Sequence, residues 1–175
     1  MSRRIMLTLL VGALTTGVVG CGGATNGSPT TATSAGAKTL FNPCTGIPDH
    51  AVAAAGADPR SEEPGIAGVH QSGWEICSWR GAKYTITVFS TSRTVSEFER
   101  KPGNVEFQDV MVAGRHGRQF RVEGASKYLD CDVLFPAFQG VVQLRILNRA
   151  GMDGLEEPCT VLYRVGESIV PALPR

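Results

Sequence analysis

The chain has five cysteines, and the first of them, Cys21, ends a predicted N-terminal export signal. The other four, spread along the rest of the chain, constrain its fold more than any other feature. Cys44, Cys77, Cys131 and Cys159 are far apart in sequence, and no histidine lies near them at a zinc-finger spacing. This spacing argues against a zinc site. An even number of cysteines in an exported domain instead predicts two disulfide bonds. The folded domain must therefore bring distant segments of the chain together at two points.

Three pairings of these four cysteines are open. We favour Cys44–Cys77 and Cys131–Cys159, because each of these bonds would join a predicted helix to a predicted strand. By the chain-entropy argument, each bond would contribute roughly 3–4 kcal/mol to the free energy of unfolding.

The N-terminal segment has the organisation of an export signal. Basic residues in Met1–Arg4 precede an uncharged apolar run over Ile5–Val19. This run is shorter than the roughly 20 residues of a membrane-spanning helix and has the length of a signal-peptide core. It ends in Val18-Val19-Gly20-Cys21, which resembles the bacterial lipobox, where a cysteine thiol is acylated after cleavage in front of it. We therefore expect a lipoprotein signal peptide over residues 1–20 and lipidation of Cys21.

The residues that follow Cys21 are small and polar. Gly22–Lys38 contains no aromatic and no large aliphatic residue, so it cannot bury enough apolar surface to fold. We expect an acylated cysteine and flexible tether over residues 21–39, and a single folded domain over residues 40–175. The lipid on Cys21 would then hold the protein at the cell membrane, on its extracytoplasmic side.

The composition excludes several classes of protein. The chain is 42% hydrophobic and 19% charged, which is enough for a folded core. Its 17 Lys and Arg against 16 Asp and Glu give no basic excess, so we expect no nucleic-acid partner. Glycine-rich phosphate-binding motifs and metal-ligand spacings do not occur, so we expect neither a cofactor nor a metal.

Periodicity predicts an α+β fold. Alternation of apolar and polar residues predicts strands over residues 74–80, 84–90, 106–112, 117–122, 129–135 and 141–147. Helices are predicted over residues 47–55, over a short stretch from Ser92 or Thr94 to Glu99, and over residues 158–170. The residues between 58 and 73 are rich in proline and glycine and predict a long exposed loop. The expected fold is an antiparallel sheet of about six strands with the N-terminal and C-terminal helices packed on one face and two disulfide bonds.

A set of motifs in a fixed order resembles a known family. After the lipobox come Asn42-Pro43-Cys44, Cys77-Ser78-Trp79, Cys131-Asp132-Val133 and Pro158-Cys159. This order is similar to that of actinobacterial, especially mycobacterial, envelope lipoproteins that carry a domain of unknown function of the DUF3558 type. The resemblance covers about residues 40–174. It implies membrane anchoring and two disulfide bonds, and it offers no catalytic residues to carry over.

The three histidines are the candidate catalytic bases. His50 lies in the first predicted helix, His70 in the long loop, and His116 at a hairpin tip. A hydrolase with a Ser-His-Asp triad would place its serine in a Gly-x-Ser-x-Gly turn, and the sequence has none. We therefore expect these histidines to be solvated.

Charged residues form two further candidate sites. Arg115, Arg118 and Arg121 make the densest basic cluster, which could bind a phosphate or sulfate group. Asp130 and Asp132 share a strand face and could form a carboxylate pair. We favour a solvated polar surface for both clusters, with Arg121 facing solvent.

The two tryptophans have opposite parity in one strand. Trp74 and Trp79 therefore point to opposite faces of the sheet. We expect one of them in the core and the other lining a groove or lying under a loop.

The function that these features favour is a non-enzymatic binding or accessory module of the cell envelope, whose partner is an envelope protein, lipid or glycan. The site is expected on the sheet face that the helices leave open, among polar residues such as Gln143 and Arg145 and beside the 58–73 loop, because long loops are often functional. The Arg115–Arg121 hairpin is the next candidate. The alternatives are an envelope hydrolase that uses His70 or His116, and a structural spacer.

Overall fold

The computed structural model describes residues 39–175. The predicted signal peptide, Cys21 and nearly all of the predicted tether lie outside the described residues. Within the described part, no helix is long and apolar enough to cross a membrane.

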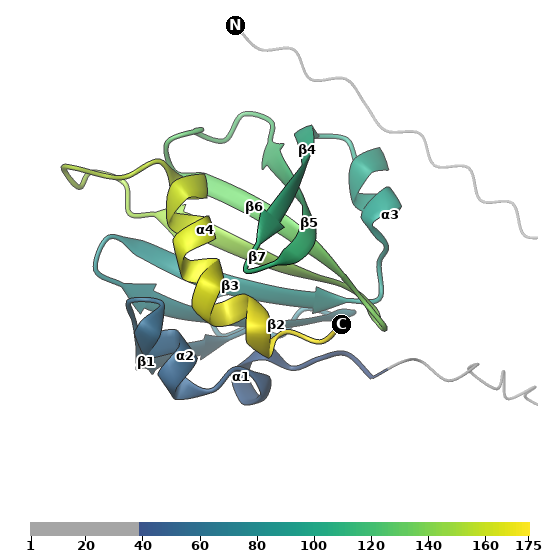
Figure 1. The fold of residues 1–175 in the computed structure, drawn as a ribbon, viewed down its shortest axis with the longest axis horizontal. Coiled ribbons are helices and arrows are strands. Elements are labelled where there is room, and N and C mark those ends of the chain that lie inside the picture. Colours follow the sequence, from purple (N-terminus) through teal and green to yellow (C-terminus); the bar gives the residue numbers. More distant parts are fainter. Residues whose placement is uncertain (1–38) are drawn as a thin grey trace, which may run out of the picture. The chain divides into compact units, whose positions relative to one another are not determined.

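One antiparallel sheet of seven strands organises the domain (Figure 1). Its spatial order is β1-β2-β3-β7-β6-β5-β4, so β7 and β6 lie at the centre and β1 and β4 at the edges. The strands are β1 (Ala57–Pro64), β2 (Trp74–Gly81), β3 (Tyr84–Thr91), β4 (Asn104–Val112), β5 (Arg115–Val122), β6 (Asp130–Ala137) and β7 (Gly140–Asn148). The prediction of an antiparallel sheet is confirmed, and the prediction of about six strands is wrong by one.

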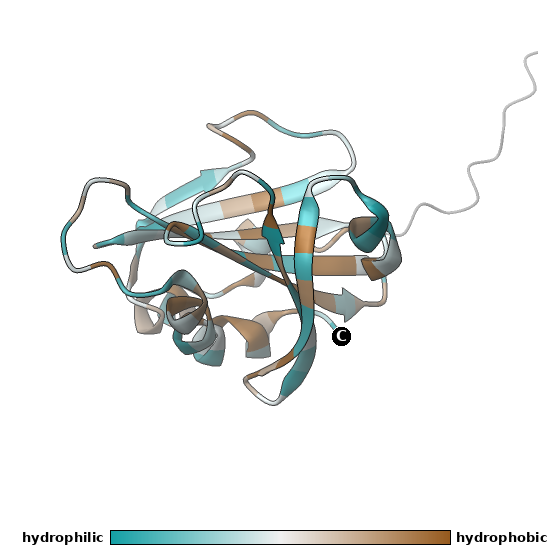
Figure 2. Cartoon of the chain, turned by 90° about the horizontal axis from the view of Figure 1, so that it is seen from above, coloured by the Kyte–Doolittle hydropathy of each residue, from teal (hydrophilic) through white to brown (hydrophobic). Residues whose placement is uncertain are grey.

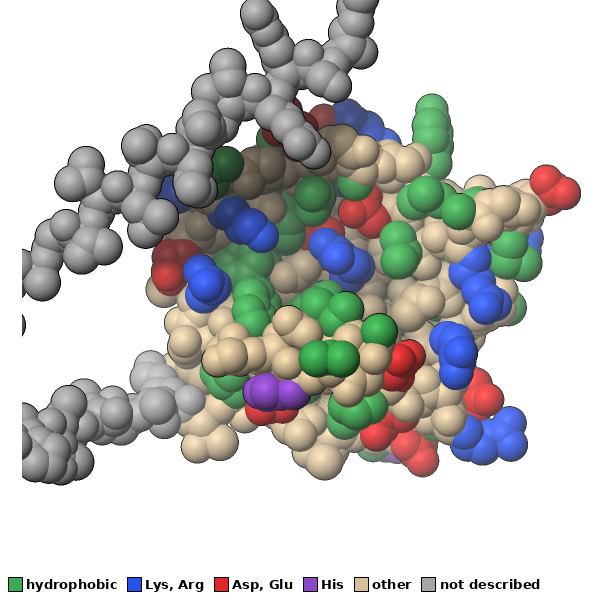
Figure 3. All heavy atoms as spheres, turned by 180° about the vertical axis from the view of Figure 1, so that it is seen from behind, with side chains coloured by type: hydrophobic (Ala, Val, Ile, Leu, Met, Phe, Trp, Pro, Cys, Tyr) green, Lys and Arg blue, Asp and Glu red, His purple; other side chains and the backbone are tan. Residues whose placement is uncertain are grey.

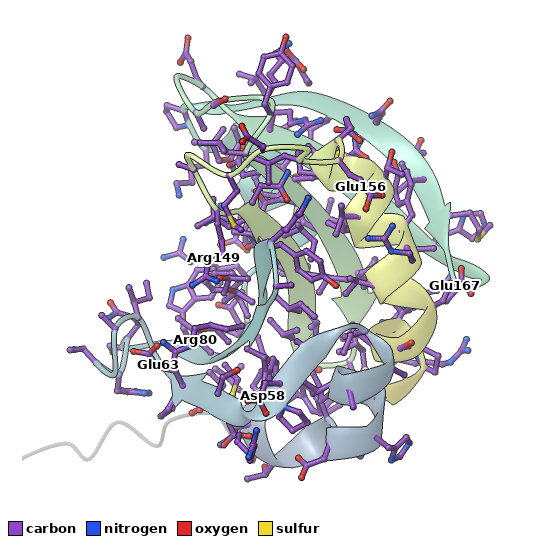
Figure 4. The ribbon with its side chains drawn as sticks, turned by 90° about the vertical axis from the view of Figure 1, so that its left-hand side faces the viewer. Asp58, Glu63, Arg80, Arg149, Glu156 and Glu167 are labelled. Carbon is purple, nitrogen blue, oxygen red and sulfur yellow. A yellow bond between two sulfur atoms is a disulfide. The ribbon has the colours of Figure 1, made fainter. Side chains whose placement is uncertain are left out.

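The additional strand is β1, in the segment predicted to be a loop. Glu63 and Pro64 pair with Ser78 and Cys77 of β2, and a register shift separates them from the pairing of Asp58 with Arg80. Only residues 65–73 connect β1 to β2, and Ile66 and Val69 form a bridge there. β1 is an edge strand, where charged residues and prolines are tolerated and an apolar face is not required. Figure 4 shows Asp58, Glu63 and Arg80 along this edge.

Most helices cover one face of the sheet. The helices on this face are α1 (Pro43–Gly46), α2 (Asp49–Ala54) and α4 (Pro158–Ile169), followed by the 3-10 turn Val170–Ala172. Leu162 and Val165 of α4 and Val52 of α2 pack with the inward side chains of the strands in the larger core. Seen from above, these helices lie together on one side of the strands (Figure 2). The prediction that N-terminal and C-terminal helices share one face is therefore confirmed.

Both disulfide bonds tie a helix of this face to a strand. Cys44 of α1 is bonded to Cys77 of β2, with the Cα atoms 5.2 Å apart. Cys131 of β6 is bonded to Cys159 of α4, with the Cα atoms 5.1 Å apart. These are the two pairs favoured from the sequence.

Within residues 39–175, the opposite face carries one short helix, α3 (Val95–Arg100). Thr94 caps it, since its side chain accepts a hydrogen bond from Glu97 N while the Glu97 carboxylate accepts one from Thr94 N. This reciprocal arrangement is a capping box, which fixes where a short helix begins. Phe98 of α3 joins Phe120, Leu134 and Val141 in a second, smaller hydrophobic cluster. No other helix of the described part of the chain lies on this face, and a groove opens there.

Candidate binding groove

A groove of about 490 Å³ lies on the sheet face opposite α4. Its floor comes from β2, β3 and β7, one wall from the 65–73 loop, and the other from α3 and the start of β4, with β5 beside it. The aromatic, aliphatic, basic and amide side chains that line the groove include Ile66, Trp74, Phe89, Phe98, Lys101, Phe120, Gln143 and Arg145. Figure 3 shows this face, where hydrophobic and basic side chains gather around a hollow. A mostly apolar hollow of this size with a few polar groups is typical of small-molecule sites.

Strand alternation explains why these side chains share one face. In β7, Val142, Leu144 and Ile146 belong to the core under α4, so Gln143 and Arg145 point to the other side. Trp79 of β2 belongs to that same core, and Trp74 lines the groove. The expectations for the two tryptophans and for Gln143 and Arg145 are therefore confirmed.

Aromatic rings form a continuous series along the groove. Trp74 makes edge-on contacts with Phe89 and with Phe98, each at 6.1 Å between ring centroids. Phe98 contacts Phe120 at 6.1 Å, and Phe120 stacks on Phe107 at 5.4 Å. Such contacts fix the orientation of each ring relative to the next. The apolar surface of the groove is therefore held in a defined shape by its own packing.

A buried ion pair lies at the floor. Arg145 Nε and Nη2 donate to the two carboxylate oxygens of Asp132, at 2.8 and 3.1 Å. Gln143 Nε2 also donates to Asp132 Oδ1, at 2.6 Å. Asp132 is completely buried, whereas the Arg145 side chain retains 30% of its exposure and lies over the ring of Phe89. Arg145 Nη1 forms no hydrogen bond within residues 39–175, so it can donate to a ligand.

Burial controls the electrostatics of Asp132. It raises the pKa of this carboxyl, and the charge and hydrogen bonds of Arg145, together with the Gln143 hydrogen bond, oppose the rise. The interpretation of Asp132 as part of a solvated polar surface is therefore wrong. The sequence could not reveal the pair, because it depends on the register that places Asp132 opposite Arg145.

The sequence matches one protein family over nearly its whole length. The match spans residues 16–172, and the family is described as a protein of unknown function, DUF3558. The chain belongs to this family. No curated protein matches the sequence, and no solved structure matches the chain. The DUF3558 description names no activity, so any function has to be argued from the groove and its surroundings.

In this DUF3558 protein, the candidate histidines lie outside the groove. His50, His70 and His116 are all exposed, and no hydrogen bond involves their side chains within residues 39–175. His70 lines a separate hollow with Glu62 and Glu75, and His116 lines another with Glu99 and Asp109. The described residues bring no serine into either hollow. They therefore do not assemble a Ser-His-Asp arrangement around these histidines.

The basic cluster is dispersed into three structural roles. Arg115 donates to the carbonyl oxygens of Pro136 and Pro174 and thereby holds the C-terminal segment. Arg118 forms ion pairs with Glu99 and Asp109. Because their donors are directed at protein acceptors, these two arginines do not form a common anion site with Arg121.

Arg121 faces the helical side of the sheet and not the solvent. It forms an ion pair with Glu157 at 2.7 Å, and its side chain is only 13% exposed. Glu157 is also the N-cap of α4 and accepts a hydrogen bond from Thr160 N at 2.8 Å. The prediction that Arg121 is solvated is therefore wrong, because α4 begins directly against this strand.

A grouping with metal-ligand chemistry occurs at one disulfide bond. Cys44, Cys77 and Glu62 place their donor atoms within 4.8 Å of one another. Both sulfur atoms belong to the disulfide, so neither is available as a thiolate. These residues do not fit a metal.

Sequence reasoning missed much of the second wall. Phe98, Lys101 and Phe120 come from α3, its C-terminal end and β5, and the fold brings them to the open face. For Phe120 the sequence did contain a signal. Phe120 alternates with Gln119 and Arg121 along the strand, so it points to the sheet face opposite theirs.

Proposed function

We propose that this chain is a lipid-anchored lipoprotein of the actinobacterial cell envelope, held on the extracytoplasmic side of the membrane through Cys21, and that it acts as a non-enzymatic binding module. The groove opposite α4 is its binding site. The observation that carries the proposal is the combination in this groove of a fixed aromatic lining with a basic side chain, Arg145, that keeps one donor group free.

Three further features support this proposal. The family match begins at residue 16 and therefore includes Cys21. Two disulfide bonds suit an exported domain, because such bonds persist in oxidising compartments. The histidines of the hydrolase alternative lie outside the groove, which favours binding over catalysis there.

Replacement of the lipidated residue tests the anchor. Cys21→Ala should leave an uncleaved precursor or release the domain from the membrane fraction, because lipidation needs the thiol. Membrane fractionation with detection of the acyl chain by mass spectrometry measures this. Recovery of the variant as an acylated membrane protein would contradict the lipobox.

Obstruction of the groove tests the binding role. Ser72 is exposed and lines the groove, so Ser72→Trp should fill it without disturbing the core. Ser92→Trp is the matched control, since Ser92 is also exposed and does not line the groove. The full chain isolated from its envelope should carry a small molecule, detected by native mass spectrometry, that Ser72→Trp loses and Ser92→Trp keeps. Equal occupancy in all three proteins would overturn the assignment of the groove.

A further inference from the structure

A second hollow adjoins the groove at its aromatic wall. Trp74, Phe98 and Lys101 line both spaces, and the second one, of about 320 Å³, adds Arg93 and Glu97. Because these three residues line both, the two hollows adjoin each other along them. Together they offer a long apolar part over β2, β3 and β5 and a short polar end at α3.

The polar end carries two exposed cations, Lys101 and Arg93. The side chains of Lys101 and Arg93 are exposed and form neither an ion pair nor a hydrogen bond within residues 39–175. Glu97 is the one acid that lines the two hollows, and it already accepts hydrogen bonds from Thr94 N and Oγ1 at 2.7 and 2.9 Å. Arg93 already interacts electrostatically with Glu97, so an anion arriving at this end would meet Lys101 as its main cation and Arg93 as a second one.

At the floor of the groove, the basic side chain already has an acidic partner. Arg145 is already held by Asp132 through two hydrogen bonds, so its charge is balanced below the groove. Lys101 is therefore the better partner for a full negative charge. The surface between them, with Phe89 and Phe120, is suited to a hydrocarbon chain, because each methylene group that leaves water there favours binding.

We propose that the groove binds a single-chain amphiphile with an anionic head group, of the class of long-chain fatty carboxylates. The chain lies along Trp74, Phe89 and Phe120, and the head group pairs with Lys101 and Arg93. A hollow of this volume accommodates a ligand of drug-like size, which suits one acyl chain. This inference rests on the proposed binding function and specifies its ligand.

Titration calorimetry of the full chain with three probes tests the ligand class. Dodecanoate should bind about tenfold more tightly than 1-dodecanol, which has the same chain without the charge. Acetate, which has the head group alone, should show no binding. The affinity for dodecanoate should fall as salt is added, because the ion pairs are near the surface and are screened.

A charge reversal at the polar end tests the head-group site. Lys101→Glu should weaken dodecanoate binding about tenfold and leave 1-dodecanol binding unchanged. Arg100→Glu is the matched control at the neighbouring position, since Arg100 is the last residue of α3, hydrogen-bonds to Ser96 and lines neither hollow. Its affinity for both probes should equal that of the unmodified chain. Melting curves of both variants verify that the fold is retained.

Three results would overturn this inference. If 1-dodecanol binds as tightly as dodecanoate, the ligand is a neutral amphiphile. If Lys101→Glu and Arg100→Glu behave alike, the head group lies elsewhere. If neither probe binds while Ser72→Trp still removes a co-purifying molecule, the groove binds another class of ligand. In each case the proposed binding function stands or fails separately, by the Ser72→Trp comparison.

Discussion

Arg145 holds the Asp132 carboxylate from the neighbouring strand with two hydrogen bonds, at a point where Asp132 has no contact with solvent. Asp132 on β6 and Arg145 on β7 are direct register partners. Each charge is therefore stabilised mainly by the other. The floor of the groove depends on this pair, since Arg145 also lies over the ring of Phe89.

Removal of one partner should be strongly destabilising. Arg145→Met leaves a buried carboxylate without its cation, and breaking a buried pair in this way costs about 3–5 kcal/mol. Urea unfolding followed by circular dichroism measures this loss. In the double variant Asp132→Leu with Arg145→Met, apolar side chains replace both charges, and most of the stability should return. A double variant as unstable as Arg145→Met would show that the loss comes from packing and not from the unpaired charge.

The N-cap of α4 should make stability depend on acidic pH. Burial acts to raise the pKa of Glu157, and the hydrogen bonds from Arg121 and from the first turn of α4 outweigh it, so the pKa lies below the ordinary 4.5. A carboxyl whose pKa is lowered in the folded state stabilises the protein fully at pH values above the unfolded pKa of 4.5. This contribution is lost as the pH falls from 4.5 through the lower pKa of the folded state.

Glu157→Gln should therefore lower the urea midpoint at neutral pH, and the difference from the unmodified chain should shrink as the pH falls below about 4.5. Glu123→Gln serves as the control, because Glu123 is exposed and forms no ion pair within residues 39–175. A difference that stays constant with pH would show that the negative charge of Glu157 does not contribute to stability.

Local patterning was sufficient to predict most of the sheet and insufficient for its first strand. Strands β2 to β7 alternate apolar and polar residues or carry apolar runs, because at least one face of each is buried or, in the edge strand β4, half-buried. β1 has no such pattern, since it lies at an edge and pairs with β2 alone. Besides the strand pairing, the Ser61 side-chain hydroxyl accepts a hydrogen bond from Arg80 N at 2.8 Å. Hydrophobic periodicity cannot detect a strand that buries so little.

The site residues also differ in how far the sequence predicts them. Alternation predicted that Gln143 and Arg145 point to the open face, because each strand decides this locally. The pairing of Arg145 with Asp132, and that of Arg121 with Glu157, depend on how separate strands and α4 come together. Neither pairing has a counterpart in the local sequence, so the sequence alone left both arginines unpaired.

The bond between Cys131 and Cys159 should contribute strongly to stability. It attaches α4 to the central strand β6, and the two cysteines are 28 residues apart. Replacement of both by alanine should lower the free energy of unfolding by roughly 3–4 kcal/mol, because the unfolded chain is no longer restricted. Peptide mapping without reduction should recover Cys44–Cys77 and Cys131–Cys159. Recovery of Cys44–Cys159 or Cys77–Cys131 peptides would contradict this pairing.

The 65–73 loop contains two similarly exposed apolar residues, of which one lines the groove and the other does not. Ile66 and Val69 are bridge partners with similar exposure, at 55% and 61%, but only Ile66 lines the groove. Ile66→Ser should weaken the binding of both dodecanoate and 1-dodecanol about fivefold, from the loss of ~1 kcal/mol of apolar contact. Val69→Ser should leave both affinities unchanged. Calorimetric titration of the two variants measures this, and equal effects of the two substitutions would mean that the loop acts through its conformation and not through contact with the ligand.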